Sequence, residues 1–141
     1  MGRRTLLPGW LQSLFPEIPL GKRGERAAAR YLKRRGFRIL AQGDRLLPGE
    51  LDLVALDRGT VVFVEVKTRR SAGTGHPAEA VSAAKQRRLT RLAVTFLKRH
   101  GLLEHSARFD VVAVTWPEGS RPTIEHFENA FDAVGQGEFY S

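Results

Sequence analysis

Four charged residues interrupt two of the most apolar stretches of the chain: Glu50 and Asp52 in the first, Glu65 and Lys67 in the second. Strands that are apolar on both faces are usually buried on both sides, so charged side chains within them need an explanation. Two buried carboxylates repel each other and lose hydration, and a divalent cation relieves both costs. Oxygen ligands favour Mg²⁺ or Mn²⁺ over zinc. We therefore predict a metal site at Asp52 and Glu65, with Lys67 placed to activate a water molecule or to neutralise charge in a transition state.

The spacing of the two stretches predicts a β-hairpin. Residues 50–57 and 60–68 are strand-like, and the Arg-Gly pair between them is typical of a two-residue turn. In that register Asp52 faces Glu65, because opposed side chains on antiparallel strands project to the same face. A four-residue loop gives the same pairing, whereas a three-residue loop would shift it.

The same register places Glu50 opposite Lys67. A solvated salt bridge between these two residues, with Asp52 and Glu65 as ordinary polar-face residues, is the alternative to a metal site. The apolar residues that flank all four positions favour the metal site, since they predict strands that are covered on both faces.

Two predicted helices each direct one charged side chain toward the sheet. The first spans about residues 22–35, and the second begins after Ser82 as its N-cap and ends near residue 100. Glu25 extends the inward apolar stripe of the first helix, and Lys85 heads that of the second. A favourable position in the helix dipole for Glu25 and a lysine at the rim of the core for Lys85 are the alternatives.

Composition narrows the class of protein. The chain has 141 residues and no cysteine, and its four histidines lack metal-binding spacing, so disulfides, thiol nucleophiles and Cys-based zinc sites are excluded. Prolines interrupt the apolar N-terminal residues before a membrane helix or signal peptide is complete. We expect a cytoplasmic protein with no membrane association.

The organisation of the chain predicts one α/β domain at residues 21–132, between a flexible N-terminal arm at residues 1–20 and a C-terminal tail at residues 133–141. The expected order is helix, three strands, helix and two strands, which suits a central mixed β-sheet flanked by α-helices. Asp110, in a strongly apolar strand, is expected to be structural and to pair with Arg108 or with a helix terminus.

Positive charge is concentrated in the first part of the chain. Residues 1–100 contain 21 basic and 8 acidic side chains, and residues 101–141 contain 2 and 7, within a total charge of +8. Basic runs are usually solvated helix faces. Next to the predicted carboxylate pair, Arg69, Arg70 and Arg88 favour a phosphate-contacting surface instead.

The motifs together resemble a known nuclease core. Asp52, then Glu65-Val66-Lys67 in the next strand, and a helical Glu25 resemble the PD-(D/E)xK nucleases. More closely, the chain resembles the YraN-like family of bacterial proteins over about residues 20–132. The matching stretches are Gly24–Ala27, Gly49–Ala55, Val62–Arg69, Ala80–Ser82 with Lys85–Arg87, Arg108–Val112 and Glu128–Phe131.

This resemblance implies a restriction-endonuclease-like core and a role for each matching residue. It implies that Asp52 and Glu65 bind the metal and that Val66 lends its carbonyl oxygen. It also implies that Lys67 is the catalytic lysine and that Glu25 completes the site, as in the Holliday-junction-resolvase-like branch. The remaining residues implied to contact the substrate are Arg45, Lys85 and Gln86.

The predicted function is that of a Mg²⁺- or Mn²⁺-dependent endonuclease that hydrolyses phosphodiester bonds in DNA, including branched or structured DNA. The arginines would hold the backbone without reading sequence. Two alternatives stay open: a non-catalytic nucleic-acid-binding module, and a protein-docking factor on the same scaffold. The expected partner is nucleic acid, with DNA the expected form, and a homodimer is left open.

Overall fold

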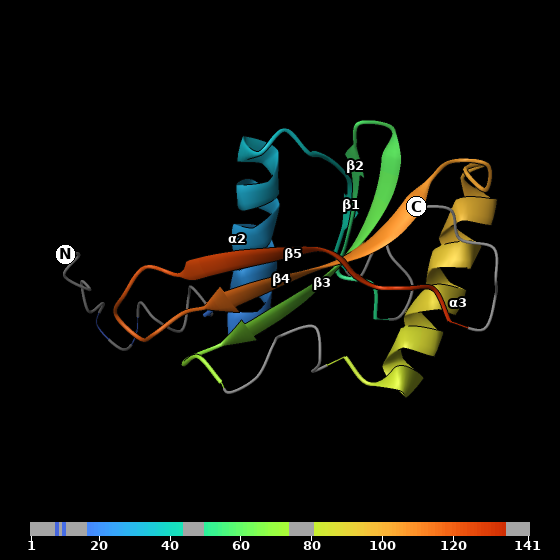
Figure 1. Ribbon diagram of the computed structural model, residues 1–141. Helices are drawn as coiled ribbons and strands as arrows, with labels where there is room; N and C mark the ends of the chain where they lie inside the picture. The colour runs from blue at the N-terminus through green and yellow to red at the C-terminus, as the bar shows by residue number, and fades with distance from the viewer. Residues whose placement is uncertain (1–7, 9, 11–16, 44–49, 74–80, 135–141) are drawn as a thin grey trace.

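The computed structural model describes Pro8, Trp10 and residues 17–43, 50–73 and 81–134. Most of the predicted N-terminal arm, most of the predicted tail and the predicted substrate contact Arg45 lie outside the described residues. The described chain forms one five-stranded mixed sheet with a helix against each face (Figure 1). This confirms the predicted α/β architecture of a central mixed sheet flanked by helices.

The order of elements agrees with the prediction. The described elements are α2 (Leu20–Arg34), β1 (Arg38–Gln42), β2 (Leu53–Asp57), β3 (Thr60–Arg69), α3 (Ala83–Arg99), β4 (Ala107–Thr115) and β5 (Thr123–Phe131). The strands lie side by side in chain order, and β3 and β4 are the parallel pair while the other neighbours are antiparallel. A parallel pair needs a long crossover, and α3 lies within that connection.

Helix α2 covers one face of the sheet with a stripe of small and apolar side chains. It begins directly after Pro19, whose fixed φ suits a helix start, and Gly36 follows its end at φ 93°. Ala28 and Leu32 are fully buried and pack with Val62 and other even-numbered residues of β3 and β4. Alternation along the strands therefore assigns these even-numbered positions to the α2 side.

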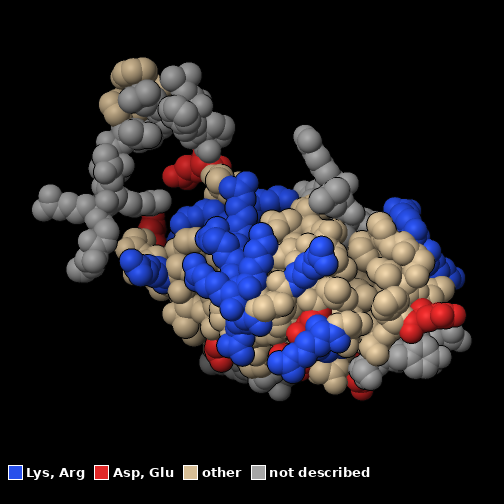
Figure 2. Space-filling view, turned by 90° about the horizontal axis from the view of Figure 1, so that it is seen from above, with Lys and Arg blue, Asp and Glu red and all other residues tan. Residues whose placement is uncertain are grey.

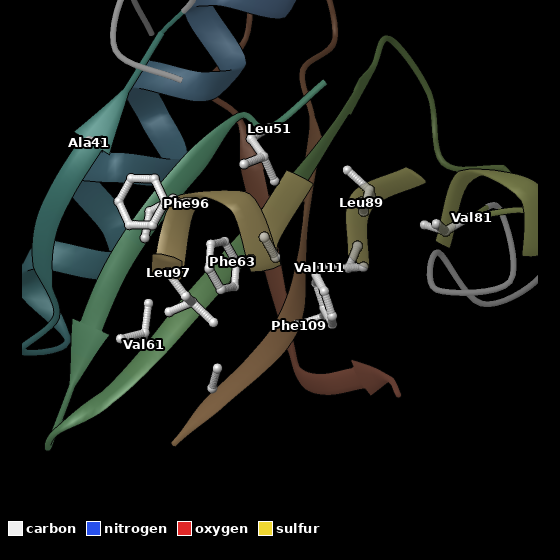
Figure 3. Packing of buried hydrophobic residues seen from close by; sticks show 13 residues of the cluster. Ala41, Leu51, Val61, Phe63, Val81, Leu89, Phe96, Leu97, Phe109 and Val111 are labelled. Carbon is white, nitrogen blue, oxygen red and sulfur yellow. The ribbon is translucent and has the colours of Figure 1, made fainter. Parts of the chain in front are cut away.

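Helix α3 covers the opposite face. Ser82 is its N-cap, as predicted, and its Oγ accepts a hydrogen bond from the backbone N–H of Lys85 at 3.1 Å. Phe96 meets Phe63 edge-on, with ring centroids 5.8 Å apart, and Phe63 lies in turn beside Phe109 (Figure 3). Odd-numbered positions of β3, Glu65 included, therefore point to the α3 side.

The β2–β3 hairpin has the register predicted from its turn. Asp57 pairs with Thr60 and Leu53 with Val64, around a two-residue turn in which Arg58 and Gly59 both have positive φ. Strand β2 begins at Leu53, however, and not at residue 50 as predicted. The residues before Leu53 are thus free to turn their side chains toward α3.

Candidate active site

The two predicted metal ligands lie together where β2 begins. Asp52 directly precedes β2, and its Oδ2 accepts a hydrogen bond from the backbone N–H of Val66 at 2.9 Å. Glu65, one residue earlier on β3, is only 7% exposed. The hairpin therefore brings one partly buried and one buried carboxylate to the same end of two neighbouring strands.

The surroundings of Asp52 disfavour its charge. Burial is the largest cause, and the nearby Glu65 carboxylate adds to it, so the pKa of Asp52 rises to about 8. The hydrogen bond from the Val66 N–H opposes this rise, while a side-chain hydrogen bond with Glu65 and the charge of Glu25 reinforce it. Near neutral pH, burial and the Glu65 carboxylate therefore disfavour the charged form of Asp52.

Glu65 uses its two oxygens differently. Its Oε2 accepts a hydrogen bond from the Lys85 ammonium at 2.5 Å, whereas its buried Oε1 has no hydrogen-bond donor among the described residues when Asp52 is ionised. Burial works against the charge of Lys85, but the bond and the attraction from Glu65 outweigh it and raise the pKa of Lys85. A buried acceptor without a donor is costly, and a cation would satisfy it.

Glu50 does not face Lys67, contrary to the predicted pairing. Its Oε1 accepts a hydrogen bond from Arg88 Nε at 2.9 Å, and its Oε2 lies 3.9 Å from Lys85 Nζ. The bond from Arg88 lowers the pKa of Glu50. The pairing fails because the β2–β3 ladder stops at Leu53, which lets Glu50 reach α3. Sequence reasoning missed the Glu50–Arg88 pair, for which the only signal was the spacing of Arg88 one turn after Lys85 on α3.

Glu25 is brought to this end of the sheet by an unusually close helix–strand contact. A Cβ atom on the preceding residue, Gly24, would lie 1.8 Å from Thr68 Oγ1, so only glycine allows α2 to approach β3 this closely. The charge of Glu25 is felt by Asp52. Across the described ranges, no three His, Asp or Glu side chains form a group able to hold a metal ion. What the structure assembles is a pair, Asp52 and Glu65, with Glu25 as its nearest acidic neighbour from α2.

The chemistry of this donor set fits a hard divalent cation. The pair offers carboxylate oxygens, one of them buried and unpartnered, and Val66 adds a backbone carbonyl between Glu65 and Lys67. Lys67 is exposed and, two residues beyond Glu65, projects from the same face of β3. None of the ion pairs between described residues involves Lys67.

The other residues predicted to contact the substrate differ in what their side chains bind. Lys85 and Arg88 are held by carboxylates of the site, as described above, and Gln86 Nε2 donates to the Val81 carbonyl at 3.0 Å. Arg70 Nη1 donates to the carbonyl of Trp116 at 3.2 Å, and the guanidinium of Arg23 stacks on that indole ring. Arg69 is partly buried, with an Nε that has no hydrogen-bond partner within the described structure. The stacked Arg23 was not predicted.

A basic surface follows α2. Figure 2 shows Lys and Arg side chains gathered over this helix, next to few acidic ones. Its exposed members are Arg26, Arg30, Lys33, Arg34 and Arg35, continued by Arg38 on β1. We call these six residues the α2 basic surface. Glu25 is the only acidic residue of α2.

A second buried carboxylate lies away from this pair. Asp110 on β4 is 0% exposed, and its oxygens accept hydrogen bonds from Arg108 Nε at 2.9 Å and from the Asn129 N–H at 2.9 Å, with His126 Nε2 at 2.8 Å. Arg108 also reaches Asp57 at 3.0 Å. The predicted pairing of Asp110 with Arg108 is thus confirmed, and the Asp110 network is complete without an external ligand.

Among the helices that the structure describes, none has the length and apolar character needed to span a membrane.

Comparison with known proteins places the chain in a family. Residues 24–114 match the Uncharacterised protein family UPF0102. A UPF0102 protein from Rhodopirellula baltica is 50% identical over 132 residues, which cover 91% of this chain and 79% of that protein. UPF0102 proteins from Geobacter sulfurreducens and Symbiobacterium thermophilum are each 50% identical, over 80% and 81% of this chain and 88% and 97% of their own lengths.

Among solved structures, the chain is similar to that of Hjc, a Holliday junction resolvase from Archaeoglobus fulgidus. The TM-score is 0.41 and the sequence identity 25%, over 77% of this chain and 76% of the resolvase. The sequence match and the relatives agree with the YraN-like motifs noted above, and the chain belongs to the protein family UPF0102.

Proposed function

We propose that this protein is a divalent-metal-dependent nuclease that hydrolyses phosphodiester bonds in DNA. The observation that carries the proposal is the pair formed by Asp52 and Glu65. One carboxyl group has its pKa raised to about 8, and the other has a buried oxygen with no partner among the described residues. Such an arrangement is unfavourable by itself and becomes favourable with a cation.

Each residue of the site has a role in this proposal. Asp52 and Glu65 would hold Mg²⁺ or Mn²⁺ together with the Val66 carbonyl, and Glu25 would complete the set from α2. The bound cation would supply positive charge at the scissile phosphate. Lys67, exposed on the same face of β3, would orient the attacking water or stabilise charge on the phosphate.

The α2 basic surface supports nucleic acid as the substrate. Four of its six exposed cations lie on the helix that also carries Glu25, so a bound backbone could run from the carboxylate pair along α2. Contacts of this kind neutralise phosphates and depend strongly on salt, and they do not read base sequence. The proposal is therefore a nuclease that recognises backbone and shape, including the branched or structured DNA that the motifs suggest.

A cleavage assay tests the proposal. Labelled linear duplex, single-stranded and four-way-junction DNA are incubated with the protein and Mg²⁺ or Mn²⁺, and with EDTA as the metal-free control. We expect cleavage that needs the metal and is lost in Asp52→Asn, Glu65→Gln and Lys67→Met. The matched controls Glu104→Gln and Lys98→Met alter exposed residues away from the pair and should cleave normally. No cleavage of any substrate, or equal cleavage by wild type and site variants, would overturn the proposal, and salt-dependent binding alone would favour the non-catalytic module.

A further inference from the structure

Lys85 is the cation in direct contact with the carboxylate pair. Its Nζ lies 2.5 Å from Glu65 Oε2 and 3.9 Å from Glu50 Oε2. The hydrogen bond that the Lys85 backbone N–H donates to Ser82 Oγ fixes the backbone of Lys85 in the first turn of α3. The side chain is nevertheless 30% exposed, so the ammonium has a path to solvent.

We propose that Lys85 is an exchangeable countercharge that couples cation binding at this site to binding of a polyanion. Without a divalent cation, Lys85 neutralises Glu65. With one bound, Lys85 leaves Glu65 and binds a phosphate oxygen of the substrate. This inference rests on the proposed function, since it concerns the same metal and the same class of substrate.

Charge balance supports the exchange. A divalent cation at Asp52 and Glu65 neutralises the Glu65 carboxylate, which attracts Lys85 when no cation is bound. The cation also repels the Lys85 ammonium directly. Glu50 holds Lys85 only weakly in comparison, because its Oε1 is bonded to Arg88 at 2.9 Å and its Oε2 lies 3.9 Å from Lys85 Nζ. A lysine carries its charge on a flexible four-carbon stem, so the ammonium can move while the helix stays in place.

The exposed basic residues next to Lys85 would attract a phosphate group that the released ammonium can bind. Arg87 and Arg88 follow it on α3, and both are exposed. A phosphate that approaches this turn meets several cations, and Lys85 adds one more once it is released. The resemblance to the YraN-like family implied that Lys85 contacts substrate, and the contact with Glu65 makes that role conditional on the cation.

Metal affinity is the first test, measured by calorimetric titration of Mn²⁺ into protein without DNA. Lys85→Met removes the competing charge, so Mn²⁺ should bind roughly three- to tenfold more tightly than to wild type, while the metal-free variant should unfold at a lower temperature. Lys85→Arg should stay close to wild type, and Lys98→Met, on the last turn of the same helix, should change neither quantity. Unchanged or weaker Mn²⁺ binding by a folded Lys85→Met would overturn the inference, since loss of a merely structural contact would weaken the site.

Coupling is the second test, and it separates this inference from the proposed function. Affinity for a labelled DNA duplex is measured with and without Mn²⁺ in a Lys67→Met background, which prevents cleavage. Mn²⁺ should tighten binding, and adding Lys85→Met should reduce that gain at least threefold. Reciprocal linkage requires DNA to raise Mn²⁺ affinity by the same factor. An equal gain with and without Lys85 would refute the coupling even if wild type cleaves DNA, whereas coupling without cleavage would refute only the nuclease.

Discussion

The pKa values of two aspartates in this protein, Asp110 and Asp52, are shifted in opposite directions. Asp110 is 0% exposed, yet its pKa is lowered, because Arg108, His126 and the Asn129 N–H outweigh a large cost of burial. Asp52 is less deeply buried, yet its pKa rises to about 8. It receives a single N–H hydrogen bond, and the carboxylates of Glu65 and Glu25 add to the cost of burial.

The difference teaches that partners, more than depth, decide whether a buried carboxylate stays charged. The Asp110 network supplies every partner from within the chain and ties β4 to β2 and β5. The Asp52–Glu65 pair lacks a hydrogen-bond donor for one buried oxygen among the described residues. A site that is complete by itself stabilises the fold, and one that is incomplete is suited to an external ligand.

The largest effect is expected from a substitution that breaks the Asp110 network. Asp110→Ala leaves Arg108 and His126 facing an empty buried site, so we expect a loss of about 3–5 kcal/mol in the free energy of unfolding. Urea denaturation followed by circular dichroism measures it. Asp57→Asn, which removes the more exposed partner of Arg108, should cost clearly less. A small loss for Asp110→Ala would mean that the network does not stabilise the fold.

Removing the charge of Asp52 should raise the free energy of unfolding, whereas removing that of Asp110 should lower it. Because its folded pKa is raised above the unfolded value, the folded metal-free protein binds an extra proton between about pH 4 and pH 8. Stability is therefore fully present at low pH and falls as pH rises, by up to about 1.4 kcal/mol per unit. Asp52→Asn should remove this slope and be more stable than wild type at pH 7 to 8. Thermal unfolding in EDTA at several pH values checks it, and parallel pH curves for the two proteins would contradict it.

A smaller effect should come from the close contact of α2 with β3. Gly24→Ala forces a Cβ into Thr68, so we expect a loss of about 1–3 kcal/mol as α2 moves away. Glu25 would retreat from Asp52, which should lower the pKa of Asp52 toward its usual range. NMR titration of the aspartate and denaturant unfolding measure both effects. Gly24→Ala with Thr68→Ala should recover part of the stability, because the hydroxyl is the nearest obstacle.

The smallest effect is expected at the exposed rim of the pair. Arg88→Ala removes the bond to Glu50, but both partners are already exposed in the wild type, so the cost should stay below about 0.5 kcal/mol. The pKa of Glu50 should rise toward its ordinary value. A loss above 1 kcal/mol, by the same denaturation assay, would show that Arg88 supports the buried pair itself.

Local patterns were enough to predict the frame of the site. A two-residue turn fixed the register of the hairpin, so the meeting of Asp52 with Glu65 followed from counting along two strands. Ser82 was recognisable as an N-cap because capping depends on residues within one turn. These are short-range effects, in which neighbours in sequence are neighbours in space.

The partners of charged side chains could not be predicted in the same way. Glu50 was assigned to Lys67, because nothing in the alternation shows where a ladder ends, and tertiary packing turned it to Arg88 instead. The contact of Lys85 with Glu65 depends on how α3 crosses the sheet. Strand β5 runs to Phe131 across an irregular pairing that includes Asn129 at positive φ, and alternation along the strand does not indicate such an irregularity.

The parallel pairing of β3 with β4 has a consequence for the order of folding. The β2–β3 hairpin closes around two residues, so its contacts are local and form early. Lys85 reaches Glu65 only after the chain has left β3 and folded α3 back across the sheet. The two carboxylates are therefore placed by a local turn, whereas the ammonium that neutralises Glu65 depends on the long connection through α3. A change in that connection would leave the carboxylates in register and remove their countercharge.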